Sequence, residues 1–195
     1  MTATLTDPTL DSSVEVRTTA TIAMAFAADP MARWCWPEAH QYLAGIPRFI
    51  RAFAGGAFDH GTADRTEGFE GAALWLPPGV GPDEEATLAL LQDSIAPDRQ
   101  AEVLAVMEQM GSHHPQGPHW YLPMIGVDPA HQGRGIGGTL LQLALARCDR
   151  DRLPAYLEST NARNLPLYRR HGFEAVAEIQ VGSSPVVVPM VRRPR

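Results

Sequence analysis

The sequence predicts an α/β or α+β domain, in which helices flank a β-sheet. Short apolar runs of strand length, bounded by glycine or proline, occur at residues 72–76, 119–127 and 155–159. Longer segments show helical periodicity, as in residues 97–110, where apolar side chains recur at positions i, i+3, i+4 and i+7. The clearest unit is a strand, a glycine-rich turn and an amphipathic helix within residues 119–150.

The N-terminal part is expected to contain a tail, a short strand and two helices. Residues 1–13 are rich in Thr, Ser and Asp and predict a disordered tail. Polar and apolar residues alternate over residues 14–17, which predicts a strand, and the alanine-rich residues 18–28 predict a helix. A second helical pattern precedes the glycine pair at residues 55–56.

The remaining patterns complete a single domain. We expect a hairpin-like pair of strands over residues 61–76, two helices over 83–110, a helix over 163–171 and a final strand pair around 182–184. The sequence contains no internal repeat and no linker composition. Residues 14–195 are therefore expected to form one domain.

The composition is typical of a soluble cytoplasmic protein. A chain of 195 residues with 45% hydrophobic content can bury a core without metal or disulfide crosslinks. A formal net charge of -6 opposes binding to the phosphate backbone of nucleic acids. No apolar stretch approaches the roughly 20 residues that cross a bilayer, and no secretory signal is present.

Cysteine and histidine residues are interpreted as structural. Cys35 and Cys148 are far apart and lack metal-ligand spacing, so we expect small buried hydrophobic residues in a reducing compartment rather than nucleophiles. His113, His114 and His119 gather near a Gly/Pro loop without an accompanying acidic or cysteine ligand. We therefore expect surface or packing histidines and no metal site.

The glycine-rich loop at residues 133–138 admits two interpretations. It matches G-x-G-x-x-G, and Glu158 lies about 20 residues further on, where a dinucleotide-binding fold places its ribose-binding acid. In that fold the strand leads almost directly into the first glycine, whereas residues 128–132 intervene here. Too few residues follow to complete a dinucleotide domain, so NAD binding is the minor alternative.

The residues of this loop are typical of a site that binds an anion. Small residues at a helix start let successive backbone N–H groups converge on an anion, and the helix dipole favours phosphate there. The loop therefore predicts a pyrophosphate ligand. A plain tight turn that caps the helix is the alternative without a ligand.

Two segments carry a family resemblance. Residues 132–137, Gln-Gly-Arg-Gly-Ile-Gly, resemble the Gln/Arg-x-x-Gly-x-Gly/Ala signature of the GNAT acetyltransferases, which cradles the pyrophosphate of coenzyme A. Residues 157–161 and 167–173 resemble the second coenzyme A segment of the same superfamily, in the same order and with matching spacing. Over residues 120–173 the chain is particularly similar to puromycin N-acetyltransferase and its relatives; before residue 118 the similarity is looser.

The resemblance implies a GNAT fold, with a mixed, mostly antiparallel sheet of six to seven strands flanked by helices. It also implies a V-shaped split between two central strands, one ending at Val127 and the other spanning residues 155–159. Pro123 cannot donate to a strand ladder, which is compatible with the distorted strand that a split requires. Acetyl-CoA would enter this split.

The resemblance assigns the cofactor contacts to the strand end, the loop and the second segment. The residues expected to bind acetyl-CoA are Ile125, Gly126, Val127, Gln132, Gly133, Arg134, Gly135, Ile136, Gly137, Gly138, Asn161, Asn164 and Tyr168.

The catalytic assignments also follow from the resemblance, each beside a structural alternative. Tyr168 matches the tyrosine that protonates the coenzyme A thiolate, and packing is its alternative; a free tyrosine has a pKa of about 10 and a thiol roughly 8.5. Glu158 could hold or deprotonate the incoming amine, or be a solvated strand end. Asn161 could bind cofactor, cap a helix, or do both. Trp34 and Trp36 could wall the acceptor site or pack in the core.

The predicted function is direct transfer of an acetyl group from acetyl-CoA to a primary amine of a small molecule, in a ternary complex. The alternatives are acetylation of a protein or peptide amine, or a non-catalytic module that senses acyl-CoA. The expected partners are a small amine and, at most, a second copy of the chain, with neither nucleic acid nor membrane.

Overall fold

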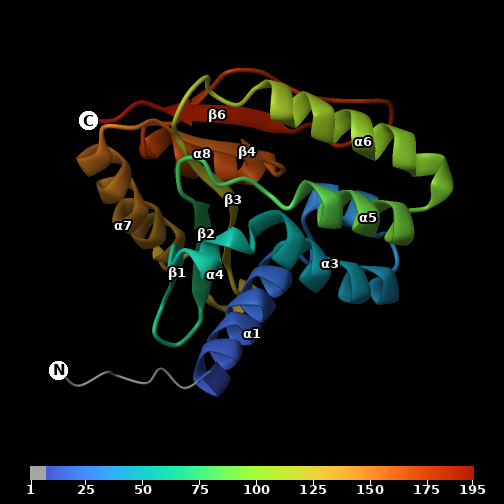
Figure 1. Ribbon diagram of the computed structural model, residues 1–195, viewed down its shortest axis with the longest axis horizontal. Helices are drawn as coiled ribbons and strands as arrows, with labels where there is room; N and C mark the ends of the chain where they lie inside the picture. The colour runs from blue at the N-terminus through green and yellow to red at the C-terminus, as the bar shows by residue number, and fades with distance from the viewer. Residues whose placement is uncertain (1–7) are drawn as a thin grey trace.

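The computed structural model describes the backbone of residues 8–195 and the side chains of residues 13–195 (Figure 1). In chain order its elements are α1 (Pro8–Ala25), α2 (Pro30–Cys35), α3 (Ala39–Ala54), α4 (Gly56–Asp59), β1 (Ala63–Arg65), β2 (Gly71–Leu76), α5 (Glu84–Ser94), α6 (Pro97–Ser112), β3 (Trp120–Val127), the 3₁₀ turn η1 (Pro129–His131), α7 (Ile136–Asp151), β4 (Ala155–Ser159), the 3₁₀ turn η2 (Ala162–Asn164), α8 (Leu165–Arg170), β5 (Glu174–Ala175) and β6 (Val188–Arg192).

The described strands form one six-stranded sheet in the order β1-β2-β3-β4-β6-β5. Four of its five ladders are antiparallel, and only the central pair of β3 and β4 is parallel. The predicted hairpin is β1 with β2, and the two predicted amphipathic helices are α5 and α6. The expected mixed, mostly antiparallel sheet flanked by helices is therefore confirmed.

The two central strands part soon after they meet. Their ladder contains two residue pairs, Trp120 with Ala155 and Tyr121 with Tyr156, although β3 continues to Val127. On its other side β3 carries an extra residue, because two residues of β3 lie between the partners of Leu74 and Leu76, whereas one residue of β2 lies between Leu74 and Leu76. This bulge contains Pro123, and a proline at a bulge deprives no ladder of a donor. The sheet therefore opens in a V between β3 and β4.

Helices cover both faces of the sheet (Figure 1). All six residues of β2 are buried: Leu74 and Leu76 contact the core beneath α1 and α3, while Trp75 contacts the core beneath α7. Cys148 of α7 is fully buried, and burial raises the pKa of its thiol to about 12. The same cause raises the pKa of Cys35 to about 12, so both thiols stay protonated at neutral pH.

The N-terminal prediction is corrected. Residues 14–17 lie inside α1 rather than in a strand, because α1 packs against β2 and β3 and its helix extends back to Pro8. A four-residue alternation is too short to outweigh that packing. Of the expected tail, residues 8–13 belong to α1 and residues 1–7 lie outside the described residues. The final strand pair is β5 and β6, with residues 182–184 in the intervening loop.

A buried arginine anchors the last strand. Arg192 is 4% exposed and donates to both carboxylate oxygens of Asp149 on α7 at 2.8 Å, and to the carbonyl of His171 at 3.1 Å. The hydrogen bond from this guanidinium lowers the pKa of the Asp149 carboxyl. Asp149 is partly exposed, so water can solvate its carboxylate if Arg192 is removed.

We expect Arg192→Ala to lower the free energy of unfolding by about 2 kcal/mol, because the charge-assisted hydrogen bonds to Asp149 are lost. Urea denaturation at neutral pH measures the change. The folded pKa of Asp149 lies below its unfolded value, so this stabilisation is present at neutral pH and is lost as the pH falls through the folded pKa. The exposed neighbour Arg193 provides the control, Arg193→Ala. Equal urea midpoints for Arg192→Ala and Arg193→Ala would contradict the expectation.

Candidate functional site

The glycine-rich loop forms the start of α7. Gly133 and Gly135 have φ angles of 76° and 82°, in the left-handed region that favours glycine. Gly135 is the N-cap of α7, and no side chain caps the helix. The amide of Gln132 donates to the carbonyl of Val127 at 3.1 Å and ties the loop to the end of β3. The first N–H groups of α7 therefore have no side-chain cap, and binding of an anion to them stays a prediction.

The second predicted segment lies beside this helix start. A Cβ atom built on Gly137 would lie 3.5 Å from Leu167 of α8, and one built on Gly138 would lie 3.6 Å from His171. The side chain of Asn161 accepts a hydrogen bond from the N–H of Arg163 at 3.1 Å and so caps η2. The capping role of Asn161 is therefore present. A ligand role for Asn161, and for the exposed Asn164 and Arg134, stays a prediction.

Tyr168 is buried on α8, on the sheet face that α7 covers. Its ring packs edge-on against Phe173, with centroids 6.1 Å apart. Burial, with a smaller effect from the charge of Asp29, raises the pKa of Tyr168 above its ordinary value. The phenol therefore stays protonated at neutral pH. Packing and proton donation are both compatible with this position.

A cavity of about 80 Å³ lies in the split between the central strands. Its lining includes Pro123 of β3 as well as Glu158 and Thr160, at and just beyond the end of β4. The Thr160 hydroxyl donates to the carboxylate of Asp29 at 2.7 Å, and the same carboxylate caps α2. This contact links the far end of β4 to the first helices. Burial raises the pKa of Asp29.

The two tryptophans line this inner cavity rather than the larger cleft described next. Trp36 is 2% exposed and donates its indole N–H to Ser94 at 3.1 Å, so it is a core residue. Trp34 donates to Ser183 at 3.1 Å. The core alternative therefore describes Trp36, and a role of either tryptophan at an acceptor site stays a prediction.

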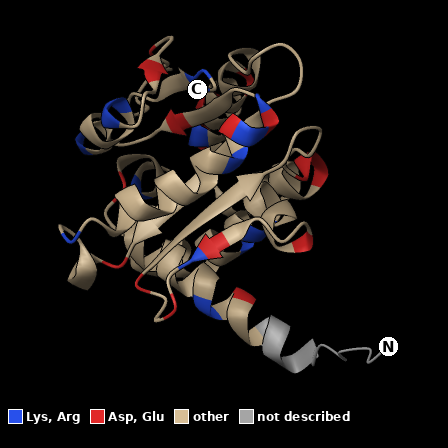
Figure 2. Ribbon diagram, turned by 90° about the vertical axis from the view of Figure 1, so that its left-hand side faces the viewer, with Lys and Arg blue, Asp and Glu red and all other residues tan. Residues whose placement is uncertain are grey.

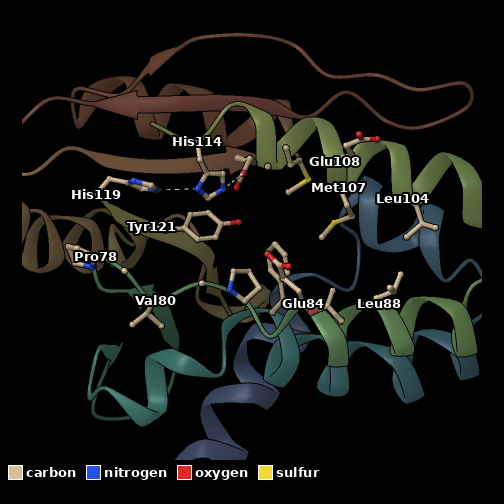
Figure 3. A pocket seen from close by; sticks show the side chains of 18 of the residues that line it. Pro78, Val80, Glu84, Leu88, Leu104, Met107, Glu108, His114, His119 and Tyr121 are labelled. Atoms are coloured by element: carbon tan, nitrogen blue, oxygen red, sulfur yellow. Dashed lines mark hydrogen bonds and ion pairs between the residues drawn. The ribbon is translucent and has the colours of Figure 1, made fainter. Parts of the chain in front are cut away.

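A cleft of about 1020 Å³ opens between α5 and α6 and reaches inward to the central strands (Figure 3). Glu84 and Leu88 project from α5 on one side, and Leu104, Met107 and Glu108 project from α6 on the other. Tyr121 and Glu158 line both this cleft and the inner cavity, so the two spaces meet at the split. Among the described residues that line the cleft, three are glutamates and none is arginine.

Glu158 points to the floor of this cleft, with a side chain only 2% exposed. One of its oxygens, Oε1, is buried, and no described residue donates a hydrogen bond to it. The Nε2 atom of His114 lies 3.3 Å from that oxygen. Burial and the charge of Glu158 raise the pKa of Tyr121 well above its ordinary value, so this phenol is neutral. A buried carboxylate at the end of a cleft, with one oxygen that accepts no hydrogen bond from a described residue, is a candidate base.

The sequence interpretation gave His114 and His119 a surface or packing role, and the structure places them beside Glu158. The ring of His114 packs between Tyr121 and Tyr156, with centroid distances of 4.7 Å and 4.3 Å. Its Nδ1 lies 3.1 Å from Nε2 of His119. The contact between His114 and Glu158 joins residues 44 positions apart in the chain, and no local spacing encodes it.

The described residues can be compared with the requirements of a metal site, a membrane span and a basic surface. No group of three or more His, Cys, Asp or Glu side chains among residues 8–195 is arranged to hold a metal ion. No helix in the same range combines the length and the apolar character of a membrane span. Acidic and basic residues are interspersed on the face drawn in Figure 2, which presents no extended basic stripe.

Residues 95–173 match the acetyltransferase (GNAT) family. The chain is 28% identical over 149 residues to an uncharacterized N-acetyltransferase of Schizosaccharomyces pombe, covering 65% of this chain and 57% of that protein. It is 39% identical over 77 residues to the mycothiol acetyltransferase of Beutenbergia cavernae, covering 37% of this chain and 26% of that protein. The chain thus spans less than two thirds of the length of these curated relatives.

The fold is similar to a solved structure of histone acetyltransferase HPA2 and related acetyltransferase from Corynebacterium glutamicum. The TM-score is 0.65 at 23% identity, over 94% of this chain and 92% of that chain. The family match includes the glycine-rich loop at residues 133–138 and helix α8. The match to the solved structure covers nearly the whole chain. Residues 95–173 are thus similar to the GNAT acetyltransferase family, and the fold of the chain is similar to that of a solved acetyltransferase.

Proposed function

We propose that this protein transfers the acetyl group of acetyl-CoA directly to a primary amine of a small molecule. The observation that carries the proposal is the opening between β3 and β4. The uncapped start of α7 lies beyond one end of it, and the buried carboxylate of Glu158 lies where it meets a large cleft. An anion site and a base therefore flank one gap in the sheet.

The residues present fit coenzyme A. Acetyl-CoA supplies an acetyl thioester, and its pyrophosphate needs converging N–H donors with little side-chain bulk. The loop of residues 133–138 offers both, because Gly135 exposes the helix start and Gly137 and Gly138 add no side chain. On the split side, the backbone of residues 125–127 has no β4 ladder partner and can bind the pantetheine arm.

Glu158 and Tyr168 perform the proton transfers in this proposal. Amines are ammonium ions at neutral pH and become nucleophiles only after they lose a proton, which Glu158 accepts at the cleft floor. Tyr168 holds its proton because of its raised pKa, and its hydroxyl donates to the departing sulfur. The neutral Tyr121 borders the same floor and restricts access of water.

The cleft favours an amine with an apolar body. Its volume of about 1020 Å³ is at the upper end of pockets that hold drug-sized ligands, roughly 300–1,000 Å³. Its walls are mainly apolar, and its charged side chains are acidic. A cationic amine attached to a bulky apolar group complements both properties, and puromycin is one such compound suggested by the C-terminal resemblance.

The test is calorimetric titration with acetyl-CoA and with NADH, followed by thiol release over a panel of amines. The panel contains puromycin, tryptamine, spermidine and a lysine peptide. All sixteen basic residues of this chain are arginines, so no lysine of its own can be acetylated and mask turnover. We expect acetyl-CoA binding and the fastest release with bulky apolar amines. Turnover with the peptide alone would favour protein acetylation, and binding without turnover would favour a sensor.

Tyr168→Phe separates catalysis from packing. We expect kcat to fall about 100-fold while the Kd for acetyl-CoA changes less than about twofold, because only the hydroxyl is removed. The control is Tyr42→Phe, which removes a buried hydroxyl that donates to the carbonyl of Ala23, away from the site. Unchanged kcat in Tyr168→Phe would leave Tyr168 with a packing role only.

A further inference from the structure

Three titratable side chains that line the cleft contact one another in sequence, and His114 and His119 are labelled in Figure 3. Glu158 Oε1 lies 3.3 Å from Nε2 of His114, and Nδ1 of His114 lies 3.1 Å from Nε2 of His119. The other ring nitrogen of His119, Nδ1, lies 2.8 Å from the carbonyl oxygen of Gly117. Exposure rises along the line, from 2% for the Glu158 side chain to 28% for that of His114.

The proton positions follow from the end of this line. A carbonyl oxygen only accepts, so Nδ1 of His119 carries a proton, and Nε2 of the neutral ring is an acceptor. Nδ1 of His114 must then donate to it, which leaves Nε2 of His114 without a proton. That nitrogen faces the buried Glu158 oxygen, which has no described donor. Nε2 of His114 and Oε1 of Glu158 are therefore two acceptors that face each other. Addition of one proton would allow a hydrogen bond between them.

We propose that His114 and His119 form a relay that carries to solvent the proton that Glu158 takes from the acceptor amine. The inference rests on the proposed acetyl transfer, for which the amine must be deprotonated at the cleft floor. The missing proton between Glu158 and His114 is the one that the substrate supplies. His114 and His119 act through Glu158 and are positioning residues in this scheme.

Each step of the relay forms one bond and breaks one. The ammonium N–H bond breaks as an O–H bond forms on Glu158, and the electron pair stays on the amine nitrogen. The proton moves on to Nε2 of His114 as the Nδ1 proton of His114 moves to Nε2 of His119. The Nδ1 proton of His119 then leaves to water. Glu158 is ionised again, and exchange of the ring protons with water restores the tautomers.

The groups around His114 position its ring and stabilise the positive charge of its protonated form. The rings of Tyr121 and Tyr156 flank His114, and aromatic faces stabilise a transient imidazolium. Burial and the charge of Glu158 raise the pKa of both phenols, so neither tyrosine competes for the proton. The remaining charged groups of the cleft are Glu84 on α5 and Glu108 on α6, both acidic. Every charge that faces the relay therefore favours its protonated form.

The kinetic test compares His114→Gln and His119→Gln with His113→Gln as the matched control. His113 is in the same loop, but its Nδ1 contacts the carbonyl of Gln109 and it does not line the cleft. We expect kcat to fall about 10- to 100-fold in the two relay variants with KM little changed. Added imidazole should restore part of the rate, and the fall in kcat at acidic pH should shift. His113→Gln should behave as the wild type.

The relay and the proposed function fail in different ways. If the wild type releases thiol and the two variants keep its rate and pH profile, the relay is wrong and acetyl transfer stands. If the wild type releases no thiol with any amine, acetyl transfer fails.

The relay can also be tested without turnover, by NMR of the histidine ring nitrogens in the wild type and in Glu158→Gln. We expect the nitrogen shifts to place a proton on Nδ1 of both rings, and the shift of His114 Nε2 to change in Glu158→Gln. Protons on the Nε2 atoms instead, or a His114 ring that does not respond to Glu158→Gln, would overturn the relay.

Discussion

Glu158→Gln is expected to reduce kcat for amine acetylation about 1,000-fold while the Kd for acetyl-CoA stays within about twofold. Glutamine keeps the size and shape of the side chain but accepts no proton, so the acceptor remains an ammonium ion without a nucleophilic lone pair. The loss should shrink at alkaline pH, where the free amine is present in solution. Steady-state thiol release from pH 6 to pH 10 measures both effects.

Glu108→Gln is the informative comparison, because Glu108 lines the same cleft on α6 but lies away from the split. Its removal should raise KM for a cationic amine and leave kcat unchanged. If both glutamine variants raised KM alone, Glu158 would bind the amine without deprotonating it, and the assignment of the base would be wrong.

Gly137→Leu is expected to weaken acetyl-CoA binding at least about 100-fold, a loss of roughly 3 kcal/mol. A side chain at this position begins from a Cβ atom with ordinary contacts, 3.5 Å from Leu167 and 3.8 Å from Val127. The fold should therefore accept it. The new side chain would instead occupy the space above the first N–H groups of α7, where the pyrophosphate binds in the proposed complex. Isothermal calorimetry with acetyl-CoA measures the change.

Gln142→Leu adds the same side chain to an exposed position further along α7 and should leave the affinity unchanged. Thermal denaturation of both variants shows whether the fold is intact. An unaltered Kd in folded Gly137→Leu would mean that the pyrophosphate does not bind at this helix start, and the glycines would then serve only the turn.

Local chemistry made one part of the site predictable. The glycines at the start of α7 allow the positive φ angles that the turn requires. The short apolar runs that form β3 and β4 are bounded by nearby proline, glycine and asparagine residues. The position of Tyr168 followed from the spacing of the second segment. These features depend on residues close together in the sequence, so the sequence alone carried them.

The rest depended on tertiary contacts. The direction of Glu158 is set by the alternation of β4, and a one-residue change of register would place it on the opposite face, beneath α7. The role of His114 depends on how the loop after α6 returns to β3, which no spacing in the sequence encodes. Helix α1 extends further than predicted because the sheet stabilises it, not because of its own amphipathic pattern.

The two-pair ladder between β3 and β4 also has a mechanical consequence. Strands β1 to β3 and strands β4 to β6 form two three-stranded units that share only this short seam of backbone hydrogen bonds. Small rotations about the seam change the width of the opening without breaking any other ladder. A ligand that contacts both units would restrict this rotation. It would therefore slow amide hydrogen exchange along residues 122–127 and raise the melting temperature of the protein.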